Sequence, residues 1–303
     1  MVAEERFADA PRLPGLKELG EDLLGVSRAR RLITLALPFA AMGCYAFFAW
    51  MKLWPLAILS VAALCFITYG STSHDLVHRT LRMPHRVNDH LLTLIELLSL
   101  RSGTAYRLSH LHHHKHLLAA DDLEGSAAHG SWLSALAAGP TMQVRLWRWA
   151  WTRYPQARPR LLSEAFGIAA LILGAVALHP QSAAPLAYAA LVIAGSWLFP
   201  FATVYLPHDA HAATALGKTR LFRAWIFRVI ALDHLYHFEH HLYPAVPHHH
   251  WRVLANRLDS YLGRAGRTRL GQSPEKVKAP TIRSSPKYAR QSLGGGALRG
   301  RAS

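Results

Sequence analysis

Long apolar runs without charge are the feature of this 303-residue sequence that most restricts its fold. No Asp, Glu, Lys or Arg occurs in residues 32–50, in residues 53–73, or in the 42 residues from Ala165 to Leu206. A helix that crosses a membrane needs about 20 predominantly apolar residues. The first two runs therefore predict one span each, and the third run is long enough for two.

Proline divides the third run. His179, Pro180 and Pro185 interrupt it near its middle, and proline cannot continue a helix. We therefore predict spans at 165–178 and 186–206, which makes four spans arranged as two hairpins. The expected fold is all-α and integral to a membrane.

Basic residues gather on one side of these predicted spans. The turn at 51–55 carries one lysine and the turn at 179–185 carries no Lys or Arg, whereas residues 71–163 carry 11 basic and 6 acidic residues and residues 207–303 carry 16 and 5. Cytoplasmic loops of membrane proteins are enriched in Lys and Arg. We predict a multi-pass protein of the bacterial inner membrane, with both termini and the central loop in the cytoplasm.

Three regions follow from this pattern. Residues 1–31 balance 6 basic against 6 acidic residues and lack an apolar segment, so we expect a cytosolic N-terminal segment without a cleaved signal peptide. Residues 32–262 form the predicted membrane domain. Residues 263–303 are basic and rich in Gly, Ser and Pro, which predicts a disordered tail. Amphipathic or buried helices are expected between and after the hairpins, at 87–100, 131–151 and 219–232.

Composition excludes some functions. The net charge is +16, but its position beside the spans favours anionic lipid at a basic surface and indicates no nucleic-acid partner. Cys44 and Cys65 both lie in apolar runs. Two such cysteines cannot build a disulfide scaffold or a thiolate metal site.

Histidine outnumbers acidic residues, with 20 against 18. A pair spaced four apart stands after the second run, and two H-x-x-H-H patterns follow later in the chain. On a helix, these spacings place the imidazoles of each motif on one face, as metal binding requires. The three motifs are His74 and His78, then His110, His113 and His114, then His237, His240 and His241.

An isolated H-x-x-x-H pair arises by chance often, but three motifs near the cytosolic ends of spans do not. Eight imidazoles also exceed the four ligands of one structural zinc ion, so two metals are indicated. Imidazole suits zinc, copper, iron and nickel, and the ligand type alone does not choose among them.

The three histidine motifs, their order around the hairpins, and the segment His240-His241-Leu242-Tyr243-Pro244 resemble the membrane fatty acid desaturase superfamily, which includes carotenoid ketolases and hydroxylases. The resemblance covers roughly residues 32–262. It implies a cytosolic helical cap that holds a non-haem centre of two iron ions (Fe2+/Fe3+), with O2 as co-substrate. It also implies that the eight histidines named above are the iron ligands.

The family often supplies a ninth ligand between the fourth span and the third motif. Tyr205-Leu206-Pro207-His208 stands there and is similar to the corresponding segment of carotenoid ketolases. His208 is the preferred ninth ligand, and His211 is its competitor.

Other residues near the motifs leave alternatives open. His112 and His116 permit a shifted register if the second motif is not helical. His248, His249 and His250 are expected to be solvated or close to substrate rather than ligands. Carboxylates beside the motifs either orient imidazoles or are solvated or capping groups, namely Asp75, Asp121, Asp122, Glu124, Asp209, Asp233 and Glu239.

Substrate and electrons must both reach this centre. We expect an apolar tunnel for a lipid from the bilayer, lined by aromatic residues near span ends. The chain has no cysteine pattern for an iron–sulfur cluster and no glycine-rich dinucleotide motif, so an external electron donor is needed, such as ferredoxin with its reductase. A basic cytosolic face suits an acidic donor. The tunnel candidates are Trp197, Phe199, Phe201, Tyr205, Tyr236 and Phe238.

The predicted function is a fatty acyl (acyl-lipid) desaturase that introduces a double bond into a lipid chain. The alternative is a β-carotene ketolase or hydroxylase, which the segment at 205–208 favours. A zinc-dependent membrane hydrolase or a metal transporter is a remote alternative. A transporter places ionisable groups within its spans, whereas these histidines flank the spans.

Overall fold

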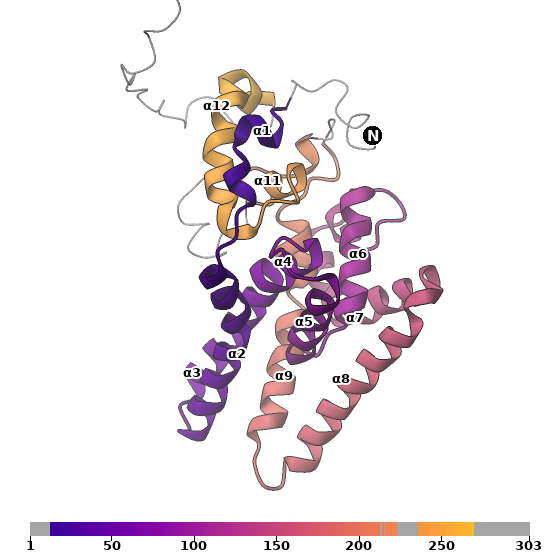
Figure 1. Cartoon of the computed structure of the whole chain (residues 1–303). Helices are drawn as coiled ribbons and strands as arrows, with labels where there is room; N and C mark the ends of the chain where they lie inside the picture. The colour runs from indigo at the N-terminus through magenta and orange to yellow at the C-terminus, as the bar shows by residue number, and fades with distance from the viewer. Residues whose placement is uncertain (1–12, 213, 215, 223–235, 270–303) are drawn as a thin grey trace, which may run out of the picture.

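The computed structural model describes residues 13–212, 214, 216–222 and 236–269 (Figure 1). Its described residues form helices and contain no strand, only an isolated bridge between His208 and Thr219. The prediction of an all-α fold is confirmed. Of the helices expected from the sequence, the one at 219–232 lies mostly outside the described residues.

Four helices are long and apolar enough to cross a membrane. The first is α2 (Arg28–Trp50), which begins at Ser27, whose Oγ accepts a hydrogen bond from the Arg30 N–H. The second comprises α3 (Trp54–Ile67), a π-helical turn η3 (Thr68–Thr72) and α4 (Ser73–His78). The third and fourth are η5–α8 (Pro155–Ala157 and Arg158–Leu178) and α9 with the π-helical η6 (Ala184–Ser196 and Pro200–Tyr205).

These helices agree with the four predicted spans, although the third begins earlier than residue 165. Their outer faces are apolar, since Trp50, Phe166 and Leu173 are exposed. Exposed apolar side chains of this density are typical of a surface that meets lipid. The turns between α2 and α3 and between α8 and α9 lie at the same end of the molecule, at the bottom of Figure 1.

Most of the remaining elements occupy the other end of the spans, whereas α5 lies between the spans, where the carbonyl oxygen of Leu98 accepts a hydrogen bond from the Tyr188 hydroxyl at 2.7 Å (Figure 1). The helices α5 and α7 agree with those predicted at 87–100 and 131–151. In chain order these elements are α1 (Leu16–Leu19), η2 (Glu21–Leu24), α5 (His85–Leu98), α6 (Gly103–Lys115), η4 (Gly125–His129), α7 (Trp132–Arg153), η7 (Leu216–Lys218), α11 (His237–Leu242), η8 (His248–His250) and α12 (Trp251–Arg269).

Close packing joins the spans to this end. A Cβ atom on Gly139 of α7 would lie 2.1 Å from the carbonyl oxygen of Trp197, which follows α9, so only glycine fits there. At the far end, Leu19 and Leu23 of the N-terminal elements are buried against Trp251 and Leu254 of α12. The helix α12 continues to Arg269, beyond the predicted start of a disordered tail at residue 263. Residues 270–303 lie outside the described residues.

Candidate metal centre

Two groups of histidines meet where α4, α6 and α11 come together. The first group contains His74, His78, His110, His114 and His240, and the second contains His113, His208, His237 and His241. Within each group, the potential ligand atoms all lie within 4.8 Å of one another. All nine histidines predicted from the sequence are therefore brought together, and none of the nine lies elsewhere.

Helical spacing explains how α6 and α11 serve both groups. On α6, His110 and His114 are one turn apart and face the first group, while His113 faces the second. On α11 the division is reversed, because His237 and His241 face the second group and His240 faces the first. A helix rotates by about 100° per residue. Two histidines at adjacent positions of one helix, such as His113 and His114, therefore point towards different groups.

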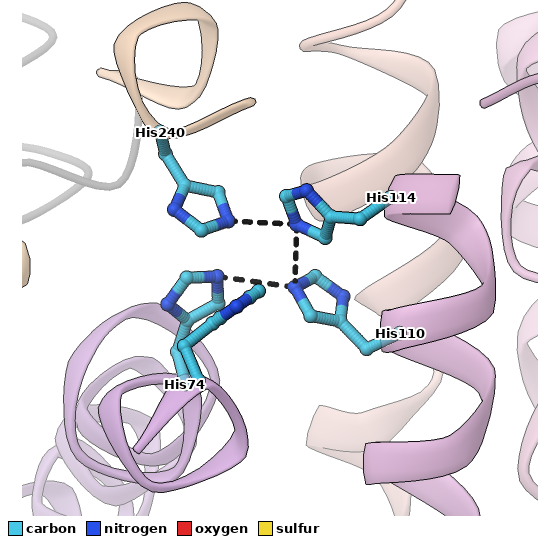
Figure 2. A group of neighbouring side chains, drawn as sticks. His74, His110, His114 and His240 are labelled. Carbon is cyan, nitrogen blue, oxygen red and sulfur yellow. Dashed lines mark hydrogen bonds between the residues drawn. The ribbon is translucent and has the colours of Figure 1, made fainter. Parts of the chain in front are cut away.

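Four imidazoles of the first group, those of His74, His110, His114 and His240, converge on a shared space (Figure 2). The Nε2 atom of His110 lies 3.2 Å from the Nε2 atoms of both His74 and His114, and that of His114 lies 2.8 Å from that of His240. The Nε2 atom of His78 is buried and has no hydrogen-bond partner among the described residues. Its ring lies 4.6 Å from the His240 ring, between centroids.

The second group is equally compact. The Nε2 atom of His208 lies 3.2 Å from those of His113 and His237 and 3.3 Å from that of His241. The two groups adjoin, since the rings of His114 and His241 stack with 4.2 Å between centroids. His211, the competitor for the ninth position, is exposed and belongs to neither group.

Three of the imidazoles form a hydrogen bond on the side that points away from the groups, and this bond determines which ring nitrogen faces the group. The Nδ1 atoms of His110 and His113 lie 2.7 Å from carboxylate oxygens of Glu124 and Asp122, respectively. The Nδ1 atom of His208 lies 2.8 Å from the carbonyl oxygen of Val204. An oxygen of this kind only accepts, so in the neutral imidazole the proton is on Nδ1 and the Nε2 lone pair faces the group.

This arrangement fits metal ions. The neutral His113 and His208 turn two lone pairs towards each other across 3.2 Å, with no proton to share between them. A metal about 2.0–2.1 Å from each imidazole nitrogen holds neighbouring nitrogens about 3.0–3.4 Å apart, close to the separations in both groups. Carboxylates behind metal-binding histidines are the usual means of orienting them.

Burial keeps most of these imidazoles neutral. Burial, together with the neighbouring imidazoles, lowers the pKa of His114, and the same causes lower the pKa values of His208, His240 and His241. Burial also opposes a charge on His113, but the Asp122 carboxylate outweighs it and raises the pKa of His113. Asp122 therefore makes the neutral His113 imidazole more basic, and a more basic Nε2 lone pair is a stronger donor to a metal ion that takes the place of the proton.

The N-terminal end of α6 is fixed by a buried carboxylate. Glu164 of α8 accepts hydrogen bonds from the Thr104 N–H at 3.1 Å and from the Ser102 hydroxyl at 2.5 Å. The Ser102 Oγ in turn accepts from the Ala105 N–H at 3.0 Å. This network holds the helix that carries three of the nine histidines.

Some contacts of the site have no signal in the sequence. The ring of Trp251, which is fully buried, lies 5.2 Å from the His74 ring and 5.0 Å from the His240 ring, between centroids. The Asp75 carboxylate lies 2.5 Å from Nδ1 of His248, so it holds the loop before α12 rather than a histidine of either group. The position of Trp251 follows from how α12 packs, which spacing alone does not reveal.

The aromatic residues expected to line a tunnel lie apart from one cavity between the spans. Phe199, Tyr236 and Phe238 are buried in the protein core. A cavity of about 620 Å³ instead lies between α2, α8, α9 and the end of α5, lined among others by Tyr45 and Leu97. None of the six predicted aromatic residues lines this cavity.

The comparisons agree with this geometry. The model of the fatty acid desaturase family matches residues 48–271. The chain belongs to the fatty acid desaturase family. A search of curated proteins found no match. Family membership makes the chain a desaturase-like oxidoreductase of the membrane, and its histidine groups are suited to metal binding.

Proposed function

We propose that this desaturase-family chain is a membrane-bound, O2-dependent fatty acyl desaturase that uses two iron ions to introduce a double bond into a lipid chain. The observation that carries the proposal is the meeting of nine histidines in two adjoining groups. Membership of the fatty acid desaturase family supports the reaction class.

In this proposal each histidine group binds one iron ion. The ligands of the first are His74, His78, His110, His114 and His240, and those of the second are His113, His208, His237 and His241. The two ions supply the activation of dioxygen, which protein side chains cannot perform. Asp122, Glu124 and the Val204 carbonyl orient three of the imidazoles from behind.

The overall reaction balances with an external reductant. Two C–H bonds on adjacent carbons break and a C=C bond forms, while O2, two electrons and two protons complete the formation of two water molecules. The surrounding side chains exclude bulk water, since His110, His113, His208 and His240 are buried. An external donor such as ferredoxin with its reductase delivers the electrons, and the +16 charge of the chain suits an acidic partner.

The proposed topology has four spans in two hairpins, with the histidine-bearing elements as a cytosolic cap and both termini in the cytoplasm of a bacterial inner membrane. The charge asymmetry of the loops supports it. The lipid substrate enters from the bilayer, and anionic lipid binds the basic surface beside the cap.

A carotenoid ketolase or hydroxylase is the second candidate. The observation that favours it is the position of His208, which follows Tyr205-Leu206-Pro207 and lies within the second group. Both candidates share the same metal ligands and need for O2, so they differ only in substrate and in the product of oxidation.

The experiment is mass spectrometry of lipids from a bacterial host that also makes β-carotene and a ferredoxin system. We expect fatty acyl chains lighter by two hydrogens with the wild-type protein and none with His114→Ala, which should still insert into the membrane. His129→Ala removes an exposed histidine outside both groups and is the matched control. Keto or hydroxy carotenoids would select the second candidate, and full activity of His114→Ala would contradict both.

A further inference from the structure

The C-terminal end of α6 presents two further histidines on a second face, His112 within the helix and His116 at its C-cap. His112 and His116 are one helical turn apart, like His110 and His114. Each lies two residues further along the chain than its counterpart in the first group. Two residues correspond to a rotation of about 200°, so this pair points away from the first histidine group. The His112 ring lies instead 5.0 Å from the Trp149 ring of α7, between centroids.

An aspartate from the following loop completes a compact cluster. An Asp121 carboxylate oxygen lies 3.1 Å from Nε2 of His112, and the other lies 4.0 Å from Nδ1 of His116. The two imidazoles stack with 4.2 Å between their centroids. One potential ligand atom from each of the three residues lies within 4.8 Å of the other two.

The orientation of His112 indicates a ligand rather than an ion pair. Its side chain is 5% exposed, and its Nε2 atom is buried without a hydrogen-bond partner in the described part of the chain. The nitrogen is close enough to Asp121 for a hydrogen bond, but the angle does not permit one. This is the geometry expected when a nitrogen and an oxygen both face a shared cation instead of each other.

We propose that His112, His116 and Asp121 form a separate binding site for a divalent transition metal of the Zn2+ class. Two imidazoles and one carboxylate are a common zinc donor set, with water at the remaining position. The site does not take part in the proposed oxidation. It joins the C-terminal end of α6 to the loop after it, in which Asp122 and Glu124 orient His113 and His110.

A neighbouring arginine separates this proposal from a simple salt-bridge cluster. The Arg153 guanidinium lies 2.8 Å from the Asp121 carboxylate and competes with a cation for it. If the cluster binds metal, Arg153→Ala raises the affinity and His116→Ala lowers it. If the cluster is only a set of ion pairs, neither substitution changes metal binding.

The experiment measures zinc binding to the full-length, iron-loaded protein by titration against a competing chromophoric chelator, with metal content from mass spectrometry. We expect the wild type to bind one Zn2+ beyond its iron. His116→Ala and Asp121→Asn should weaken that binding by about 100-fold or more, since loss of a direct ligand costs more than the 10–100-fold loss typical of an orienting partner, whereas Arg153→Ala should strengthen it. The side chains of His116 and Asp121 are 37% and 40% exposed, so these substitutions should not prevent folding.

His129→Ala is the matched control, because His129 is exposed on η4 and belongs neither to the two histidine groups nor to the cluster of His112, His116 and Asp121. Unchanged iron content shows that each variant is folded. The absence of an additional zinc in the wild type would overturn the proposal. Equal zinc affinity in the wild type, His116→Ala and Asp121→Asn would overturn it as well.

Discussion

Single hydrogen-bond acceptors set the orientation of three proposed ligands. Glu124, Asp122 and the Val204 carbonyl each hold one Nδ1 atom, so that Nε2 faces a histidine group. The proton on each of these nitrogens is fixed by a residue that does not itself reach the proposed metal. Ligand strength at the residue scale therefore depends on side chains that touch the ligands from behind.

Replacement of Glu124 tests this dependence. Glu124→Ala removes the acceptor for His110 Nδ1, and we expect iron affinity to fall by about 10–100-fold. Glu124→Gln should lose less, because its amide oxygen can accept the same hydrogen bond. The measurement is iron content per chain during titration with a chelator. Glu21→Ala removes an exposed glutamate as the control, and wild-type affinity in Glu124→Ala would argue against an orienting role.

At the residue scale, the sequence predicts which histidines belong to the site but not how they divide between the two groups. Spacings of three and four residues identified His110, His113 and His114 as neighbours, since helical geometry alone determines that. The spacing did not reveal that His113 joins a different group from His110 and His114. That division depends on where His208 and α11 pack, which is a tertiary property of residues distant in the sequence.

At the scale of elements, α6 is the helix on which both groups depend. Its C-terminal half carries three of the histidines, and its N-terminal end is held by Glu164 from α8. The two π-helical turns each end a few residues before a proposed ligand. The ligand after η3 is His74, and the ligand after η6 is His208. The uncharged apolar runs predicted helices there, but a run of apolar residues does not distinguish π from α geometry.

Glu164→Ala tests the coupling between α8 and α6. The substitution leaves the Ser102 hydroxyl and the Thr104 N–H without their carboxylate acceptor in a buried place. We expect unfolding free energy to fall by about 3 kcal/mol, with loss of iron because the histidines of α6 are displaced. Thermal unfolding in detergent and iron content measure the two effects. Ser163→Ala changes an exposed neighbour on the same helix, and it should resemble the wild type.

At the scale of the whole molecule, the histidine groups connect elements from α4 to α11. A ligand that binds only the folded protein stabilises it by about 4 kcal/mol at 1,000 times its dissociation constant. We therefore expect removal of iron by a chelator to lower the thermal unfolding midpoint of the wild type. A variant with His113→Ala and His241→Ala should respond less, because the second site lacks two of its four ligands. An equal response would mean that the chelator acts elsewhere.

The orientation in the membrane that we propose from the charges of the loops can be measured directly. Lys52 and Gln181 are exposed in the turns between α2 and α3 and between α8 and α9, whereas His129 is exposed on η4, which follows the histidine-bearing α6, and Arg252 on α12, which lies at the opposite end of the molecule from those turns (Figure 1). In a Cys44→Ser, Cys65→Ala background, a membrane-impermeant maleimide should label Lys52→Cys and Gln181→Cys in intact cells. His129→Cys and Arg252→Cys should react only after permeabilisation, because the positive-inside rule places the basic end in the cytoplasm. The reverse labelling would put the histidine groups outside the cell, where a cytosolic electron donor could not reach them.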